Sequence, residues 1–151
     1  MKSRHVIILI VYLILDQLLK LLLINKNFVL IPSVLNIEYV EVSGNTLFGF
    51  LNSVYFSCFI IMIAAIIYYN IRIKKNKKIA TPIIIVIASA CANIIDKIIR
   101  GYVVDYIAIP SLGISGINIS DIFTIIGIIA LVVVEVKYFI KKAKKKVSGT
   151  K

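Results

Sequence analysis

Carboxylates in unusual places are the part of this chain that could do chemistry. Asp16, Asp96 and Asp121 lie within or at one end of long apolar segments, and Asp105 lies between the last two of these segments. An ionised side chain inside a bilayer is costly, so such residues face a protein or water-filled interior and are functional candidates. When two carboxyl groups share a partly dry site, one holds its proton and the other stays a base. Such a pair can activate water for attack on a peptide carbonyl, which is the chemistry of an aspartyl hydrolase.

No other residue type in the chain offers a competing set of catalytic or metal-binding groups. The single histidine, His5, lies on the side predicted below to be cytoplasmic, and no serine has a base partner. Cys58 and Cys91 fall inside predicted helices, where cysteine mostly behaves as a small apolar residue. A metal site would need histidines or a denser carboxylate cluster. We therefore expect no metal and no cofactor.

Two of the aspartates also fit a purely structural role as members of ion pairs. Asp16 and Lys20 are four residues apart, so they share a helix face and can pair. Asp96 can pair with Arg100 in the same way. Spacing alone does not separate this role from the support of a catalytic site.

The other polar residues of these segments have structural interpretations of the same kind. Asn93 and Asp96 are three apart on one predicted helix, where they could serve helix packing or support a site. Asn118 and Asp121 are three apart where the last predicted helix begins, so Asp121 could be a cap favoured by the helix dipole. Asp105 stands in an apolar stretch between valines and a tyrosine, which is less common for an aspartate of a surface loop.

The elements that must position these residues are four apolar segments. The chain has 151 residues, 60% of them hydrophobic and 17% charged, and its mean hydropathy is +1.00. Each segment has about 19–24 residues, enough at ~1.5 Å per residue to cross a hydrocarbon core of ~30 Å. The first segment contains Asp16 and Lys20 and no small-residue cleavage motif follows it, which favours a retained helix over a removable signal peptide. The sequence predicts an all-α membrane protein with a single domain, residues 1–151, and four transmembrane helices at about 6–24, 50–69, 79–99 and 117–140.

The net charge of +11 is concentrated on one side of this arrangement. Fourteen of the eighteen Lys and Arg residues lie before the first helix, between the second and third, and at the end of the fourth. Four spans place these segments on the same side, and the positive-inside rule assigns that side to the cytoplasm. Both termini are then cytoplasmic, and we expect the basic tail at 141–151 to rest on anionic headgroups. Nucleic-acid binding is not needed to explain the charge.

Two segments on the outer side are too long for tight turns. In residues 25–49, the stretch Leu35–Tyr39 alternates apolar and polar residues, which predicts a half-buried strand. We expect a small strand-containing platform here, on the outer membrane surface between the first two helices. Residues 100–116 are expected to form an irregular loop because of their glycines and proline, namely Gly101, Pro110, Gly113 and Gly116.

The order of the short motifs resembles that of lipoprotein signal peptidase, or signal peptidase II, a family of bacterial membrane aspartyl proteases. The resemblance covers nearly the whole chain and includes the four-helix layout with both ends inside. Each motif alone is weak, but their order in a chain of this length is specific. The motifs are Asp16-Gln17-x-x-Lys20, Asn93-Ile94-Ile95-Asp96-Lys97, Gly101-Tyr102-Val103-Val104-Asp105-Tyr106-Ile107 and Asn118-Ile119-Ser120-Asp121.

The resemblance implies a function and a role for each motif. The family's catalytic pair falls on Asp105 and Asp121, which would activate water and protonate the leaving amine. The family cleaves prolipoproteins just before a cysteine that already carries diacylglycerol, at the outer face of the bacterial cytoplasmic membrane. The partners expected are this substrate and membrane lipids, for a monomer that binds no nucleic acid. The residues that would bind substrate or support the site are Asp16, Lys20, Ser43, Asn45, Asn93, Asp96, Lys97 and Asn118.

Three positions depart from the family pattern. The family usually has arginine where Lys97 stands, so a planar fork is replaced by a point charge. The stretch Ser43–Gly49 replaces the family's Asn-x-Gly-Ala-Ala-Phe-Gly, so the substrate-contacting asparagine becomes Ser43 unless Asn45 substitutes for it. Ser120 stands where the family has alanine. These departures leave open an altered substrate preference or a divergent paralogue.

Two other functions remain open from the sequence. A catalytically silent paralogue could bind lipoproteins without cutting them, although both catalytic aspartates are present. A small proton-coupled membrane carrier could use the same intramembrane aspartates, but four helices without inverted repeats disfavour it. Release of a signal peptide from a diacylated prolipoprotein by the purified protein distinguishes these functions.

Overall fold

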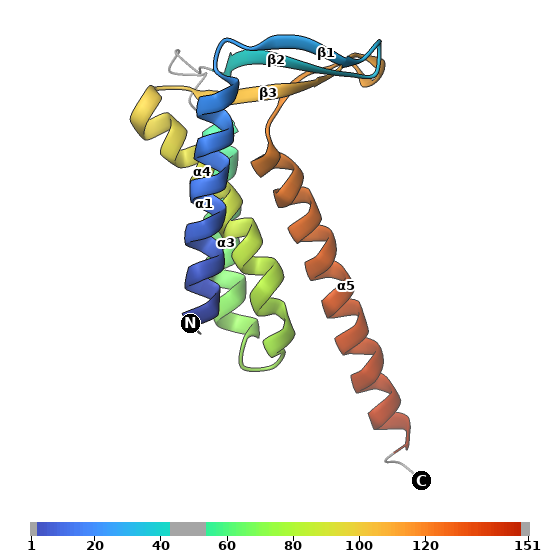
Figure 1. Ribbon diagram of the computed structural model, residues 1–151. Helices are drawn as coiled ribbons and strands as arrows, with labels where there is room; N and C mark the ends of the chain where they lie inside the picture. Colours follow the sequence, from blue (N-terminus) through green and yellow to red (C-terminus); the bar gives the residue numbers. More distant parts are fainter. Residues whose placement is uncertain (1–2, 43–53, 149–151) are drawn as a thin grey trace.

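Long helices connect a small β-sheet at one end of the molecule with both chain ends at the other (Figure 1). The computed structural model describes residues 3–42 and 54–148, and the fold is given for these residues. A short 3-10 helix, Lys77–Ile79, precedes the third long helix. The long helices are α1 (Ser3–Leu23), α3 (Val54–Arg72), α4 (Ala80–Arg100) and α5 (Ile119–Ser148).

Three segments in the described part of the chain are helical, long and apolar enough to cross a membrane. They are His5–Leu23, Lys77–Arg100 and Ile119–Lys146. The apolar helical segment Phe59–Arg72 in α3 is shorter, so the fourth span stays a prediction. In the first segment 11% of the most apolar window is buried, against 67% in the second. α4 is therefore the central helix, whereas most of the apolar side chains of α1 are exposed on the surface of the molecule.

Small residues allow the helices to approach one another closely around α4. A β-carbon on Gly127 of α5 would lie 2.7 Å from Cγ2 of Val86 on α4, so this crossing needs glycine. α4 ends at Gly101, whose φ of 81° is left-handed and whose N–H bonds to the carbonyl of Lys97. Glycine adopts this conformation without steric cost, which ends the helix and turns the chain into the sheet.

The sheet has four antiparallel strands in the order β1-β2-β3-β4. The strands are β1 (Asn27–Ile31), β2 (Leu35–Val42), β3 (Val103–Ile109) and β4 (Ile114–Ile117). The predicted strand at Leu35–Tyr39 is confirmed by β2. The register places Val40 of β2 opposite Asp105 of β3. The sheet therefore carries one of the predicted site residues itself.

The prediction of an irregular loop at 100–116 is wrong. These residues form β3, a 3-10 turn at Pro110–Leu112, and β4. Gly101 and Gly113 have positive φ and lie at the ends of elements rather than inside them. The residues of β3 are mostly β-branched or aromatic and pair with β2, from a distant part of the sequence. The sheet is thus built from both outer segments and not only from the one between the first two helices.

The helix boundaries differ most from the prediction at the C-terminus. The last helix was expected at 117–140, but α5 runs from Ile119 to Ser148, so most of the predicted basic tail is helical. Lysine is a good helix former, and cations are favourable at a helix C-terminus. The start expected at residue 50 for the second helix lies outside the described residues.

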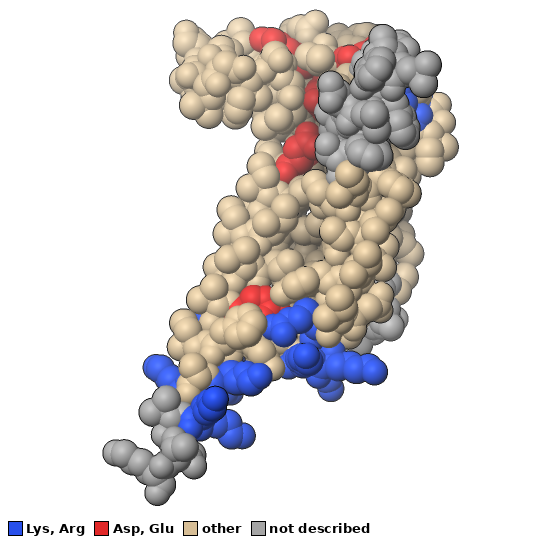
Figure 2. Space-filling view, turned by 180° about the vertical axis from the view of Figure 1, so that it is seen from behind, with Lys and Arg blue, Asp and Glu red and all other residues tan. Residues whose placement is uncertain are grey.

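Charge is divided between the two ends of the molecule. Figure 2 shows most of the visible Lys and Arg side chains gathered at the end with the chain termini, while most of the visible Asp and Glu side chains lie towards the sheet. At the basic end, Arg72 of α3 forms an ion pair with Glu135 of α5. The guanidinium also lies 5.5 Å from the ring centre of Tyr138 and 5.1 Å from that of Phe139. The ion pair between Arg72 and Glu135 joins α3 to α5 at the end of the molecule away from the sheet.

Candidate active site

Asp105 and Asp121, the two residues expected to be catalytic, share a neighbour although they lie on different elements. Asp105 is on β3 and Asp121 is in the first turn of α5. Asn118 reaches both of them. Its Nδ2 donates to Oδ1 of Asp105 at 2.7 Å, and its backbone N–H donates to Oδ2 of Asp121 at 3.0 Å. We call Asp105 and Asp121 the carboxylate pair.

The start of α5 fixes the position of Asp121. Oδ1 of Asn118 accepts the backbone N–H of Asp121 at 3.1 Å, while Oδ2 of Asp121 accepts the N–H of Asn118. This reciprocal capping box satisfies two N–H groups that a helix start leaves without partners. The predicted capping role is therefore confirmed. It does not compete with a site role, because Oδ1 of Asp121 is directed to Nδ2 of Asn93, at 2.9 Å.

Lys20 fixes the orientation of the Asn93 amide. Its ammonium can only donate hydrogen bonds, and Nζ lies 2.8 Å from Oδ1 of Asn93. The amide oxygen must therefore face Lys20, and the amide N–H groups must face Asp121. Nδ2 of Asn118 also donates to Oδ1 of Asn93, at 3.1 Å. Lysine and asparagine together thus direct a donor at Asp121.

Lys20 is fully buried between two carboxylates. Its Nζ lies 3.0 Å from Oδ2 of Asp16 and 2.7 Å from Oδ2 of Asp96, and all three side chains are 0% exposed. Together with Asn93, these acceptors use all three N–H groups of the ammonium. A buried cation is tolerated only when it is paired in this way. The expected pair of Asp16 and Lys20 is confirmed, with Asp96 as a second partner.

Asp96 connects these charges to the strand of Asp105. Its Oδ2 accepts the backbone N–H of Val104 at 3.2 Å, one residue before Asp105. Its Oδ1 accepts from Nε2 of Gln17 at 2.9 Å and from Nη1 of Arg100. The expected pair of Asp96 and Arg100 is thereby confirmed. We call Asp16, Lys20, Asp96 and Arg100 the buried ion cluster.

Ser120, one of the departures from the family pattern, extends this network. Its Oγ donates to Oδ1 of Asp16 at 2.6 Å and accepts from the hydroxyl of Tyr12 at 3.0 Å. Ser120 is 0% and Asp16 is 1% exposed. Serine therefore adds a hydroxyl to the methyl group that alanine would have here, and this hydroxyl donates a hydrogen bond to an oxygen of a buried carboxylate.

Electrostatics distinguish Asp105 from an ordinary aspartate. Burial raises the pKa of Asp105 to about 6, and the neighbouring Asp121 carboxylate adds to the rise, while the bond from Asn118 and the charge of Lys20 oppose it. Because the two carboxyl groups interact, they titrate as a pair rather than independently. In mildly acidic solution the arrangement favours one proton shared by two carboxyl groups, which is what acid–base catalysis by such a pair requires.

Gly116 brings the backbone of β4 against Asp105. A β-carbon at this position would lie 3.3 Å from Cβ of Asp105, 3.4 Å from Cβ of Val40 and 3.6 Å from Oδ2 of Asp105. Any side chain here would crowd the carboxylate. The glycine was taken from the sequence as a mark of irregular structure, whereas its place in the fold is a close approach inside a strand.

The remaining predicted site residues lie elsewhere or outside the described chain. Nζ of Lys97 donates to the carbonyl of Gly101, at the turn that leads into β3. Ser43 and Asn45 lie outside the described residues. Among residues 3–42 and 54–148, no group of three or more His, Cys, Asp or Glu side chains is arranged to hold a metal ion.

Three side chains that bond directly to Asp16 or Asp96 were not among the predicted site residues. Gln17 and Arg100 contact Asp96, and Ser120 contacts Asp16. A signal was present for two of them. Gln17 belongs to the same short motif as its neighbours, and Arg100 lies one helical turn after Asp96. The position of Ser120 next to α1 depends on helix packing and has no local signal.

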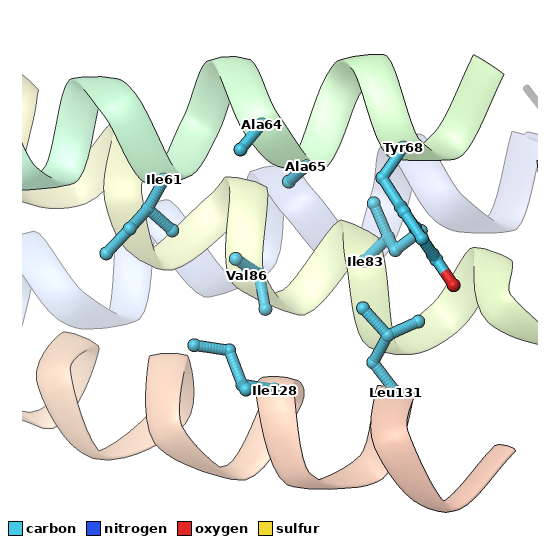
Figure 3. A pocket seen from close by; sticks show the side chains of 8 residues that line it. All are labelled: Ile61, Ala64, Ala65, Tyr68, Ile83, Val86, Ile128 and Leu131. Atoms are coloured by element: carbon cyan, nitrogen blue, oxygen red, sulfur yellow. The ribbon is translucent and has the colours of Figure 1, made fainter. Parts of the chain in front are cut away.

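A separate apolar cavity of about 310 Å³ lies between α3, α4 and α5. Its nearest residue to the network along α4 is Val86, seven residues before Asn93, or ~10 Å at ~1.5 Å per residue. The residues that line it, shown in Figure 3, are Ile61, Ala64, Ala65, Tyr68, Ile83, Val86, Ile128 and Leu131. The cavity therefore contains none of the predicted site residues.

Comparison with known proteins agrees with the arrangement of these motifs. Residues 8–137 match the family described as signal peptidase (SPase) II. The lipoprotein signal peptidase of Clostridioides difficile (strain 630) is 29% identical over 135 residues, which cover 84% of this chain and 90% of that protein. The lipoprotein signal peptidase of Thermodesulfovibrio yellowstonii is 32% identical over 129 residues, covering 80% of this chain and 86% of that protein.

Solved structures agree with these sequence comparisons. A bacterial membrane enzyme determined at 2.3 Å superposes with a TM-score of 0.69 and 25% identity, covering 91% of this chain and 90% of that one. A second, determined at 1.9 Å, has a TM-score of 0.69 and 26% identity, covering 88% of this chain and 92% of that one. The chain belongs to the signal peptidase II family.

Proposed function

We propose that this protein is a membrane aspartyl endopeptidase that removes the signal peptide from diacylglyceryl-modified prolipoproteins, cleaving before the lipidated cysteine. The observation that carries the proposal is the carboxylate pair, Asp105 and Asp121, joined through Asn118. Relatives that are named lipoprotein signal peptidase support the class of substrate.

The two carboxyl groups divide the work of base and acid. The ionised member takes a proton from a water molecule while the oxygen of that water attacks the scissile carbonyl carbon. The protonated member donates its proton to the carbonyl oxygen, which gives a neutral tetrahedral intermediate. Collapse of this intermediate breaks the C–N bond. The carboxyl that took the proton from water gives it to the leaving nitrogen, and the other carboxylate takes back a proton from a hydroxyl of the intermediate, which becomes the new carbonyl. The pKa of about 6 for Asp105 supports one proton on the pair in mildly acidic solution.

Two buried amides hold the pair ready for this cycle. Asn118 donates to Asp105, and Asn93 donates to Asp121. Asn93 and Asn118 are 1% and 0% exposed, so their bonds do not compete with bulk water. Donors that are fixed before the reaction need no rearrangement as charge moves, which is the usual source of electrostatic catalysis. Lys20 contributes by fixing the amide of Asn93.

We propose that the site faces the outer side of the bacterial cytoplasmic membrane and that both termini are cytoplasmic. The basic side chains at the end with the termini support this orientation (Figure 2). The sheet would then form a platform on the outer surface. Phe28, Val29 and Ile31 of β1 are about half exposed, which fits contact with lipid.

Further contacts with the substrate are proposed from the family resemblance alone. They involve Lys97, Ser43 and Asn45. We also propose that a monomer is active.

Incubation of the purified protein with a diacylated prolipoprotein tests the proposal. Wild type should release the signal peptide, and a precursor without the lipid should stay uncut. Asp105→Asn and Asp121→Asn should each abolish release. Near-wild-type turnover in either variant would remove the assignment of the pair, and a folded wild type that binds the substrate without cutting it would indicate a silent paralogue.

A further inference from the structure

We infer that Arg100 is a positioning residue for the carboxylate pair. Its hydrogen bonds go to Asp96 and Gln17 rather than to the pair itself, so it acts through Asp96. The inference rests on the proposed function, because a positioning task has meaning only if Asp105 and Asp121 do the chemistry.

Arg100 balances the charge of the buried carboxylates. Asp16 and Asp96 are buried carboxylates, and Lys20 has already used all three of its N–H groups. The side chain of Arg100 is only 12% exposed and supplies the second positive charge. Without it, two buried carboxylates would share one ammonium, and the buried ion cluster would carry a net negative charge beside the pair.

Arg100 forms hydrogen bonds with two neighbouring side chains that also bond to each other. Nη1 of Arg100 bonds to Oδ1 of Asp96 and lies 2.9 Å from Oε1 of Gln17, while Nε2 of Gln17 lies 2.9 Å from the same Oδ1 of Asp96. The three side chains thus close a ring of hydrogen bonds that joins α1 to α4. A guanidinium has several donors in a rigid plane and suits such a ring, whereas an ammonium acts as a point charge.

Two chains of hydrogen bonds connect Asp96 with the carboxylate pair. One arm runs from Oδ2 of Asp96 to the N–H of Val104, which precedes Asp105 on β3. A second arm runs from the same oxygen through Lys20 and Asn93 to Asp121. A shift of Asp96 would therefore reach both carboxylates by separate paths, and misplacement of about 1 Å at a reacting group can cost ~100-fold in rate.

The position of this arginine also bears on the departure at Lys97. Lys97 and Arg100 are both in the last turn of α4. Nζ of Lys97 bonds to the carbonyl of Gly101, whereas the guanidinium of Arg100 enters the buried ion cluster. The planar cation that the sequence pattern lacks at position 97 is present three residues later.

Arg100 should also set the pH range of activity. The charged and titratable groups that act on Asp105 are Asp121 from α5, Lys20 from α1, and Asp96 from α4. Loss of the guanidinium removes one of the two positive charges that pair with the Asp96 carboxylate. Added negative charge near the pair makes protons bind more tightly, so both limbs of the pH–rate profile should move to higher pH.

Kinetics on a diacylated prolipoprotein test the inference with Arg100→Gln, Arg100→Lys and a charge control, Lys26→Gln. Lys26 is exposed, follows α1 and has no place in the network. Arg100→Gln should lower kcat about 10-fold or more, change KM less than about twofold, and move both limbs up by ~0.5 pH unit or more. Arg100→Lys should keep the pH range of wild type but not its full kcat, and Lys26→Gln should match wild type in both.

Several results would overturn the inference. A folded Arg100→Gln enzyme with wild-type kcat and pH range would reduce the arginine to a stabilising role. An equal shift in Lys26→Gln would assign the effect to net charge. If Arg100→Gln does not fold, wild-type kcat in Arg100→Lys would be decisive against the ring. Failure of the proposed function is recorded separately, by a wild type that does not cleave or an Asp105→Asn variant that does.

Discussion

Replacing Asp105 with asparagine should abolish cleavage and yet stabilise the folded protein at neutral pH. Burial and the neighbouring Asp121 raise the pKa of Asp105 from 3.8 to about 6. At pH 7.5 the folded protein therefore carries an ionised carboxylate in a place that disfavours it, whereas the unfolded chain ionises freely. Asparagine has nearly the same shape, and its Oδ1 can accept the same bond from Asn118. Active-site residues that cost stability in this way are common in enzymes.

The size and sign of the effect follow from the pKa. The folded pKa lies above the unfolded one, so between pH 3.8 and about 6 the folded state binds more protons. Wild-type stability must then fall as the pH rises through this window and stay level above it. A rise of about two units at ~1.36 kcal/mol each gives roughly 3 kcal/mol. The gain from Asp105→Asn should therefore be near zero at pH 4 and reach roughly 3 kcal/mol at pH 7.5.

Asp121→Asn is a matched control, because the same chemical change should have the opposite sign there. Both oxygens of Asp121 accept bonds, Oδ1 from Nδ2 of Asn93 and Oδ2 from the N–H of Asn118. An amide has one oxygen, so its NH₂ group would face a donor. The lost acceptor should cost ~1–3 kcal/mol and weaken the cap of α5.

Thermal unfolding of the purified proteins in detergent between pH 4 and 8 measures both effects. At roughly 2–4 °C per kcal/mol, Asp105→Asn should raise Tm by roughly 6–12 °C at pH 7.5 and by little at pH 4. Asp121→Asn should lower Tm throughout. An increase for Asp105→Asn of the same size at every pH, or a lower Tm at pH 7.5, would refute the reasoning, because neither could come from a buried carboxylate that resists ionisation.

Three further predictions concern single positions. Ser120→Ala removes the bond to Asp16 and should lower Tm by a few degrees, at ~1–2 kcal/mol, with cleavage retained; a loss of turnover larger than about tenfold would contradict this. If Lys97 supplies only positive charge, turnover on a lipidated substrate should be similar in Lys97→Arg and much lower in Lys97→Ala, and alanine activity within about twofold of wild type would exclude Lys97 from the site. For topology, single cysteines at Lys75 and Ser111, both exposed, in a background without the native cysteines, should differ in intact cells: an impermeant thiol reagent should label position 111 only, and labelling at position 75 would invert the proposed orientation.

Local spacing explains which features could be predicted from the sequence. Pairs three or four residues apart on a helix must share a face, so Asp16 with Lys20 and Asn118 with Asp121 were accessible without a structure. The alternation at Leu35–Tyr39 likewise reports a half-buried strand. One of the two sheet partners of that strand is β3, more than sixty residues away, and no pattern within 100–116 reveals the pairing.

The contacts of the site that the sequence did not reveal join residues far apart in the chain. The sequence left Asn93 with two interpretations, helix packing or support of a site, and only the approach of Lys20 from α1 fixes its amide towards Asp121. The contact between Ser120 and Asp16 joins the first and last helices, so it depends on packing and not on spacing. Contacts between distant helices are decided by the whole fold, whereas caps and ion pairs within a helix are decided by a few neighbouring residues.

The placement of cations explains why two of the four aspartates around this site suit catalysis and the other two suit support. Lys20 and Arg100 form their ion pairs with Asp16 and Asp96, and these pairs balance the charge of the buried ion cluster. In the described part of the chain, the hydrogen bonds to Asp105 and Asp121 come instead from neutral donors, the amides of Asn93 and Asn118 and one backbone N–H. Neutral donors orient a carboxylate without cancelling its charge, so the second negative charge on the pair stays costly and a proton is retained. A cation bonded directly to the pair would favour ionisation of both members and remove the acid that the reaction needs.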